Sequence, residues 1–395
     1  LPLLTALVAT VAALGGCGKD DGPLVAVPGK VVTQCSQDLV ARRPYGSAVS
    51  VDRFRARVEI PRTTRSFMVV AHDGGTTSAL SSLTAPDGTL HDLVISDDLA
   101  RYHPAGLDTA FGFPVVVDRI MMPPAEPLHR LMQTGTWEIV ADTSSDRLCL
   151  SVLATDRDGV KLALDVYVVG VQNHTAESLR NSPSWRTVLR TATDIWGRAG
   201  VEIASVEYRS LDEFDTIRYQ VLSDWVEFGN LVALSKARSN SSDDRLRLNV
   251  FVIHGFAGKL ADFGLLGLST GIPGVAGVHG TPESGVVFAL GELMGGDDIE
   301  APLIGSAPAD EYLGHVMAHE IGHFLGLFHT TEVSGGGDDL ADTPVCTAIA
   351  ALRGSAILQC PDVQNLMFPL AIPGMAGDTT TQQSLSARAN PLIRP

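Results

Sequence analysis

Polar and apolar residues alternate over much of the N-terminal third of the chain. The alternation is clear in the stretches 54–60, 137–141 and 148–154, where every second side chain is apolar. A period of two is typical of a β-strand that turns one face to a core. A further strand is expected over 67–71. We therefore predict an all-β domain over residues 35–158, built as an antiparallel sandwich or jelly roll.

The pattern changes after a charged turn at residues 156–159. Residues 184–199 place apolar side chains three and four positions apart, which is the spacing of an amphipathic helix. Strands that alternate with helices are typical of a sheet covered by helices, so we predict an α/β (α+β) domain with a mixed twisted sheet over residues 159–395. Its strands are expected at 162–169, 201–208, 246–253 and 285–290, its helices at 184–199, 310–325 and 381–388, and a long glycine-rich loop at 264–280.

The first residues form an uncharged run that is rich in Leu, Val and Ala. The run is shorter than the about 20 apolar residues of a spanning helix, so residues 1–16 are predicted to be a signal peptide. Leu14-Gly15-Gly16-Cys17 resembles the lipobox of bacterial lipoproteins, in which the cysteine is acylated. The resemblance implies a lipid anchor on Cys17, a tether over 17–34, and a place on the bacterial cell envelope (outer membrane or cell surface). An ordinary signal peptide with a chance cysteine, and secretion, is the alternative.

The chain has five cysteines. If Cys17 carries lipid, four remain, and an exported protein can pair them. Three pairings are possible from the sequence. Two of the four cysteines lie in each half of the chain, which favours Cys35–Cys149 and Cys346–Cys360.

Composition and charge narrow the class of protein. Hydrophobic residues make up 45% of the chain and charged residues 19%, which is typical of a globular protein. The formal net charge is −16, whereas a protein that binds nucleic acid needs a basic face for the phosphates. We therefore expect no nucleic-acid partner.

The sequence His-Glu-Ile-Gly-His-Phe-Leu-Gly-Leu-Phe-His occupies residues 319–329. Side chains four positions apart share one face of a helix, so His319 and His323 can bind the same metal ion. Gly326 can take a positive φ and end the helix, so that the chain returns His329 to that ion. We predict a zinc site on these three histidines.

Glu320 is the predicted catalytic base of this site. Three imidazole ligands leave a fourth position open, and zinc in such a site polarises a carbonyl group and lowers the pKa of water to about 7. Glu320 follows His319 and points off the metal axis, within reach of a water proton. The alternative is a helix with ordinary surface histidines. Apolar residues throughout 313–325 indicate a buried helix instead, in which imidazoles and a carboxylate need partners.

The spacing His-Glu-x-x-His-x-x-Gly-x-x-His is the signature of the metzincin peptidases. Met367, in Asn365-Leu366-Met367-Phe368-Pro369, resembles the methionine turn of that clan. Asp342-Thr343-Pro344, followed by Cys346, is similar to the pappalysin-like family, and the resemblance covers roughly residues 161–393. It implies a metzincin catalytic domain with an active-site helix, and a zinc-dependent endopeptidase that acts on extracellular proteins or peptides.

Two details of the resemblance concern the segment after His329. Family members can bind calcium there, and Asp338, Asp339 and Asp342 offer oxygen ligands of the kind calcium takes. An acidic turn in solvent is the alternative. Several metzincin families place a tyrosine two residues after the methionine, where this chain has Pro369. We therefore assign no side chain to the stabilisation of an oxyanion.

Other interpretations remain open. A catalytically inactive, zinc-containing binding protein of the cell surface is one alternative, and Glu320 argues against it because an inactive protein needs no base. A thermolysin-like enzyme, with a downstream Glu as third ligand, is disfavoured by His329. Residues 284–287 are either a sheet edge that pairs with a peptide or an internal strand. His315 is expected near the site without binding zinc.

Overall fold

The computed structural model describes the chain in ranges separated by gaps. The described residues are 23–36, 42–43, 51–72, 79–92, 119–122, 133–143, 148–171, 174–239, 241–262, 264–291, 306–332, 337–338, 340–347, 349 and 354–395. The predicted signal peptide, the predicted lipidation residue Cys17, and Asp339 lie outside them.

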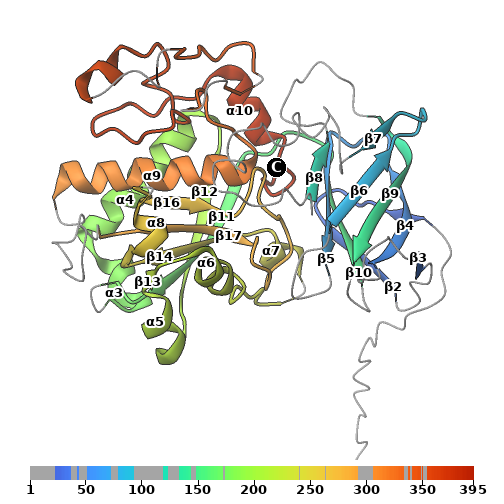
Figure 1. Cartoon of the computed structure of the whole chain (residues 1–395), viewed down its shortest axis with the longest axis horizontal. Coiled ribbons are helices and arrows are strands. Elements are labelled where there is room, and N and C mark those ends of the chain that lie inside the picture. Colours follow the sequence, from blue (N-terminus) through green and yellow to red (C-terminus); the bar gives the residue numbers. More distant parts are fainter. Residues whose placement is uncertain are drawn as a thin grey trace, which may run out of the picture.

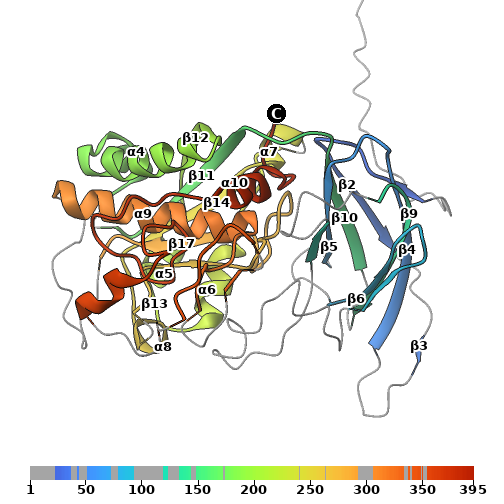
Figure 2. The same cartoon turned by 90° about the horizontal axis from the view of Figure 1, so that it is seen from above.

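Two sheets formed by residues 24–155 lie face to face, and we call them the two-sheet stack (Figures 1 and 2). All their strand pairs are antiparallel except β1 with β4. The first sheet has the order β1 (Leu24–Val25), β4 (Val51–Ile60), β9 (Gly135–Thr143), β6 (Ala79–Thr84), β7 (Leu90–Asp92), with β3 (Arg42–Arg43) beside β4. The second has the order β2 (Val31–Ser36), β10 (Leu148–Thr155), β5 (Ser66–His72), β8 (Arg119–Met122).

Alternate residues of these strands form the core between the two sheets. Val58 and Ile139 of the first sheet and Val69 and Val152 of the second belong to it, and each is fully buried. The alternation of apolar and polar residues in the sequence arises because successive side chains of a strand point to opposite faces of the sheet. The predicted disulfide Cys35–Cys149 is confirmed and joins β2 to β10.

Residues 161–395 form a sheet with helices on both faces, which we call the α/β part. Its strand order is β12 (Glu202–Ser210), β11 (Lys161–Val169), β14 (Leu248–Ile253), β17 (Gly285–Ala289), β16 (Gly267–Ser269), and only the edge strand β16 is antiparallel to its neighbour. A small parallel pair joins β13 (Val221–Leu222) and β15 (Gly255–Phe256).

The helices divide between the two faces of the larger sheet. One apolar cluster contains α4 (Pro183–Arg198), α9 (Ala307–Leu325) and alternate residues of β11 and β14. The remaining residues of these strands pack with α5 (Glu213–Tyr219), α6 (Trp225–Val232) and α8 (Gly258–Asp262). Shorter helices α3 (Ala176–Asn181), α7 (Ser242–Arg245) and α10 (Thr381–Arg388) and the 3-10 helix η2 (Gly354–Gln359) complete the part.

The mixed α/β architecture with several sheets is confirmed, and the predicted helices agree with α4, α9 and α10. The prediction of a continuous loop over 264–280 was wrong, because β16 lies within it. Residues 285–289 form an internal strand between β14 and β16, so the sheet edge is β16. The division into a jelly-roll domain and a second domain stays a prediction.

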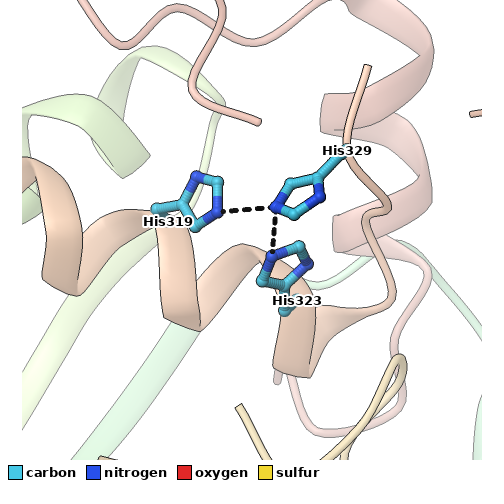
Figure 3. A group of neighbouring side chains, drawn as sticks. All are labelled: His319, His323 and His329. Carbon is cyan, nitrogen blue, oxygen red and sulfur yellow. Dashed lines mark hydrogen bonds between the residues drawn. The ribbon is translucent and has the colours of Figure 1, made fainter. Parts of the chain in front are cut away.

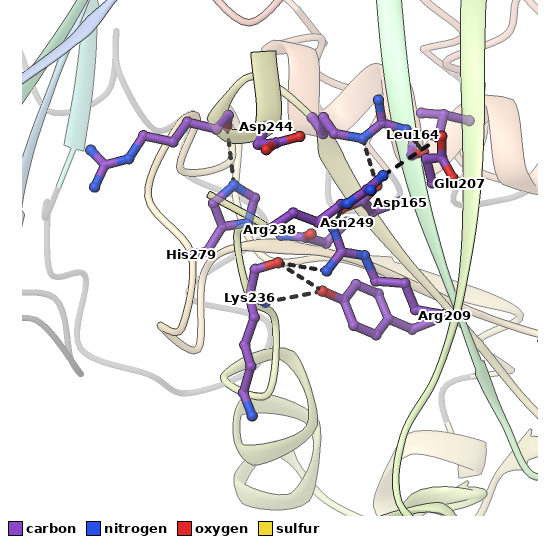
Figure 4. A network of polar contacts seen from close by, with 12 residues as sticks. Leu164, Asp165, Glu207, Arg209, Lys236, Arg238, Asp244, Asn249 and His279 are labelled. Carbon is purple, nitrogen blue, oxygen red and sulfur yellow. Dashed lines mark hydrogen bonds and ion pairs between the residues drawn. The ribbon is translucent and has the colours of Figure 1, made fainter. Parts of the chain in front are cut away.

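A buried carboxylate joins three neighbouring elements of the larger sheet (Figure 4). Asp165 on β11 is inaccessible to solvent and accepts hydrogen bonds from Arg209 of β12 and Arg247, the latter at 2.5 Å. Arg247 also donates to the carbonyl of Leu164 at 2.6 Å. A buried carboxylate costs much free energy unless it is paired and hydrogen-bonded. Two guanidinium groups meet that need here and tie β12 and the start of β14 to β11.

In the described part of the chain, no helix combines the length and the apolar character that crossing a membrane requires.

Candidate metal centre

Helix α9 carries the first two predicted zinc ligands. Its start is favoured by Pro308 in the first turn, where a missing N–H costs nothing. It ends at Gly326, which has φ 104°, and the N–H of Gly326 bonds back to the carbonyl of His323 at 2.9 Å. This left-handed conformation suits glycine and reverses the chain, as predicted. The reversal brings His329 beside His319 and His323 (Figure 3).

The three imidazoles converge through their Nε2 atoms. Nε2 of His329 lies 3.3 Å from Nε2 of His319 and 3.1 Å from Nε2 of His323. The Nδ1 atoms face hydrogen-bond acceptors: the carbonyl of Leu366 for His319 at 2.7 Å and that of Leu327 for His323 at 2.8 Å. A carbonyl only accepts, so each of these Nδ1 atoms carries the proton and each Nε2 presents a lone pair.

The third imidazole has a carboxylate behind it. Nδ1 of His329 lies 3.1 Å from Oε1 of Glu332, and this carboxylate oxygen accepts a hydrogen bond from it. Three lone pairs directed at one point repel one another unless a cation lies between them. Three neutral nitrogen ligands with the opposite ring nitrogens bound to carbonyl or carboxylate oxygens are the donor set that zinc takes in catalytic sites. The residues present therefore fit a zinc ion.

The protonation state of the buried ligands also suits a metal. Burial, with a smaller effect of the His329 charge, lowers the pKa of His319 to about 3. Burial and the two neighbouring histidines lower the pKa of His323 well below its usual value. Both imidazoles are therefore neutral at pH 7, which is the form that binds metal ions.

Glu320 lies on the same helix but faces the edge strand β16. Its side chain is buried, and burial raises its pKa to about 8, opposed by a hydrogen bond from the backbone of Ser269. Gly267, on the same strand, lies directly against this side chain: a Cβ atom there would be 2.5 Å from Cγ of Glu320. The carboxylate is thus held between helix and strand, with only backbone on the strand side.

Met367, the residue of the predicted methionine turn, lies against the active-site helix α9. It is fully buried, and a Cβ at Gly322 would be 2.5 Å from its sulfur atom. The carbonyl of Met367 accepts the N–H of Thr330 at 3.0 Å, which ties the turn to the segment that carries His329. The side chain of Asn365 accepts the N–H of Met367 at 2.8 Å and fixes the turn from within.

Sequence reasoning missed two carboxylates that support this site. Glu332 contacts His329, and its signal was an acidic residue three positions after the third histidine. Asp362 is buried and accepts hydrogen bonds from Thr330 at 2.7 Å and from Thr331 at 2.5 Å. No spacing in the sequence indicates that contact, because the partners lie more than 30 positions apart.

The remaining predicted residues have other partners. Asp342 accepts hydrogen bonds from Thr380 and from the backbone of Gln382 at the start of α10, both within 2.9 Å. Asp338 accepts bonds from Thr343 and the backbone of Leu340. These contacts account for both carboxylates without calcium. His315 bonds to the backbone of Met375 and does not belong to the group of His319, His323 and His329.

The second predicted disulfide, Cys346–Cys360, is confirmed. It lies in a small apolar cluster with Phe368, the residue after the methionine of the turn. The bond therefore closes the loop between the third histidine and the methionine turn.

Comparison with known proteins identifies the same segment. Residues 301–367 match the peptidase M43 family model, which is described as pregnancy-associated plasma protein-A. An extracellular metalloprotease of Neurospora crassa is 41% identical over 66 residues, which is 16% of this chain and 23% of that protein. An extracellular metalloprotease of Podospora anserina is 37% identical over 59 residues, 14% of this chain and 18% of that protein. The matches thus span less than a quarter of these relatives.

A solved structure, metalloproteinase-II from Bacteroides fragilis, aligns with 60% of this chain and 54% of its own, at 12% identity and a TM-score of 0.33. A similarity at that level carries no argument about function. The matched segment, by contrast, contains the three converging histidines, Glu320 and the methionine turn. Over this segment the chain is therefore similar to the peptidase M43 (pappalysin-like) family of metallopeptidases.

Proposed function

We propose that this chain is a zinc-dependent endopeptidase in which His319, His323 and His329 hold the zinc and Glu320 is the base. The observation that carries the proposal is the convergence of three imidazoles whose Nδ1 atoms are all hydrogen-bonded. When bound, zinc supplies a Lewis acid that polarises a carbonyl group and makes water more acidic. A fully closed structural site would have a fourth protein ligand. Among the described His, Cys, Asp and Glu residues, the cluster has three.

A zinc ion on the neighbouring histidines would lower the pKa of Glu320 from the value of about 8 that burial gives it. Its ionised carboxylate could then take a proton from the attacking water and pass it to the leaving amine. The position of Glu320 supports this role. Glu320 neighbours His319 on α9, but its side chain lies against β16 and does not belong to the group of three histidines. Met367 supports the ligands from below and keeps the His319 and His323 turn of the helix in place.

An extended peptide is the substrate that the site favours. Strand β16 forms the edge of the sheet in the described residues, and its Gly267 and Ser269 contact the base. A strand at a sheet edge can pair with a peptide through main-chain hydrogen bonds, independent of the peptide's side chains. Proteins or peptides outside the cell fit this proposal, since both matched relatives are extracellular metalloproteases.

The cellular setting and the domain division are also part of the proposal. Export agrees with the two disulfides and with the extracellular relatives. A lipid anchor on Cys17 rests on the lipobox resemblance alone. We divide the chain into a β-sandwich or jelly-roll domain over 35–158 and a catalytic domain over 159–395, since the two-sheet stack ends at Thr155 and the larger sheet starts at Lys161. The calcium site at Asp338, Asp339 and Asp342 stays a prediction.

Metal content and proteolysis of the purified protein test the proposal together. We expect one zinc ion per chain in the wild type and in Glu320→Ala, with casein cleavage by the wild type alone. Glu311→Ala is the matched control, because Glu311 is an exposed carboxylate of the same helix, and it should cleave like the wild type. Zinc without cleavage of any protein or peptide would favour the inactive cell-surface binding protein. A wild type without zinc would contradict the site.

A further inference from the structure

Strand β5 of the two-sheet stack is buried on both faces. Phe67 and Val69 belong to the core between the two sheets, whereas Met68 and Val70 belong to the core of the α/β part. Their exposed fractions are at most 1%. An antiparallel sheet usually leaves one face to solvent, and continuous apolar strands are typical of sheets covered on both sides. The outer face of this sheet is therefore covered by the rest of the chain.

One of the covering elements is the segment between β16 and β17, residues 270–284, which we call the connector. Val275, Ala276 and Val278 of the connector share one apolar cluster with Met68 and Val70. Gly277 of the connector, which has φ 74°, lies against the stack. A Cβ atom there would lie 2.5 Å from Cγ2 of Val31 on β2 and 3.7 Å from Cδ2 of Leu153 on β10. Backbone of the connector thus packs directly on two strands of the stack, β2 and β10.

The opposite side of the connector contacts the active-site helix. The N–H of Gly274 donates to the carbonyl of Phe324, near the end of α9, at 2.9 Å. A Cβ atom at Gly274 would lie 2.0 Å from the ring of Phe324, so the contact has no room for a side chain. The connector also begins directly after β16, whose Ser269 bonds to Glu320.

Polar contacts of Asn249 and His279, both drawn in Figure 4, hold the far end of the connector to the sheet and to α7. The side chain of Asn249 on β14 donates to the carbonyl of Ser284 at 2.6 Å. His279 bonds through Nδ1 to Asn249 at 3.0 Å and through Nε2 to the carbonyl of Arg245 at 3.1 Å. The connector is therefore clamped between the stack, the sheet and α9.

We propose that the two-sheet stack is a fixed structural support of the site, which holds the connector against α9 and so keeps β16 in register beside Glu320. Under this proposal, the stack does not swing independently to recognise substrates. The proposal does not rest on the peptidase activity, because its tests measure hydrogen exchange and association without substrate.

The first test compares two identical substitutions at neighbouring positions of β5. Val70→Ala opens space in the apolar cluster that contains Val275, Ala276 and Val278 of the connector, whereas Val69→Ala opens the same space in the core of the stack. We expect Val70→Ala to lower the exchange protection of amides 275–289 on the order of tenfold, because local opening of that segment becomes easier. Val69→Ala should leave these amides unchanged and affect those of β4 and β9. Equal effects of both substitutions on 275–289, or no effect of Val70→Ala, would overturn the proposal.

The second test cuts the chain between the two parts. A protease recognition sequence inserted between the exposed residues Asp156 and Arg157 allows cleavage of the folded protein. Each of the two observed disulfides lies within one part, so only noncovalent contacts join the fragments after the cut. We expect the fragments to elute together in gel filtration. Their separation under native conditions would contradict a fixed support, whether or not either fragment keeps zinc.

Discussion

Gly267 and Glu320 fit together only because residue 267 lacks a side chain. A Cβ at Gly267 would lie 2.5 Å from Cγ and 2.7 Å from Oε1 of Glu320, closer than real Cβ contacts allow. The predicted base is therefore positioned by a glycine of the edge strand as well as by its own helix. The backbone of β16 and the buried helix are held in place by their neighbours. A side chain added at position 267 would therefore displace the side chain of Glu320.

Gly267→Ala should consequently lower peptide hydrolysis on the order of 100-fold, since a displacement of about 1 Å in a catalytic group has effects of that size. Zinc content should stay at one per chain, because the three histidines do not contact Gly267. The measurements are kcat/KM on a short peptide and metal analysis of the same preparation. Hydrolysis at the wild-type rate would show that the carboxylate does not need this space.

A double-mutant cycle separates this clearance from general damage to β16. In the Glu320→Ala background the crowding partner is gone, so Gly267→Ala should change the melting temperature much less than in the wild type. Equal shifts in both backgrounds would indicate a conformational need for glycine at position 267 that has no relation to Glu320.

Glu332→Ala should weaken zinc binding by roughly 10- to 100-fold, which is the usual effect of removing a carboxylate that orients a ligand histidine. The reason is the contact of Oε1 with Nδ1 of His329 at 3.1 Å, which fixes the ring and its tautomer. Competition with a chromophoric chelator measures the affinity directly. Glu332→Gln keeps an acceptor and should lose less. The exposed Glu311→Gln on α9 serves as control, and an unchanged affinity in Glu332→Ala would contradict this role.

Asp362→Ala should lower the free energy of unfolding by about 2–4 kcal/mol, because it leaves two buried hydroxyl groups without an acceptor. These hydroxyls belong to Thr330 and Thr331, which follow the third histidine. Urea denaturation of the zinc-free protein gives the value. Asp378→Ala is the control: Asp378 is 60% exposed and pairs with Arg198 at 3.1 Å, so its loss should cost less than about 1 kcal/mol. If Asp362→Ala and Asp378→Ala lowered the free energy of unfolding equally, the two hydrogen bonds to Asp362 would have no special effect on stability.

Asp338 gives the protein a pH dependence of stability. Burial raises its pKa from 3.8 to about 6, so the folded protein binds this proton more tightly than the unfolded chain. That contribution to stability is present below about pH 4 and is lost as pH rises through 6. Asp338→Asn lacks the titration and should gain stability relative to the wild type over this range. Thermal melts at several pH values measure the difference, and parallel curves would contradict it.

Calcium added to the same two proteins at pH 7 tests the site that the sequence predicted. If calcium binds at Asp338, it should raise the melting temperature of the wild type and leave that of Asp338→Asn unchanged. The hydrogen bonds of Asp338 and Asp342 within the protein favour the alternative, an acidic turn without calcium, and under it calcium would shift the melting temperatures of both proteins equally.

The grouping of the three histidines was predictable because its signals are local. The four-residue spacing of His319 and His323 and the glycine at position 326 act within a single helix and its end, where geometry follows from the sequence. The edge strand was not predictable, since β16 has only three residues and includes a glycine. Its pairing with β17 is decided by tertiary contacts. The same holds for Asp362, whose partners come from a distant segment.

The two faces of β5 also determine which substitutions the chain can tolerate there. In β4, exposed residues such as Arg55 and Arg57 alternate with buried ones, so a systematic substitution scan should show tolerance at every second position. In β5, every residue from Ser66 to His72 is buried. A substitution scan of β5 should therefore show low tolerance at every position. Substitutions in segment 66–72 are therefore constrained on both faces of the strand, on one by the core of the stack and on the other by the core of the α/β part.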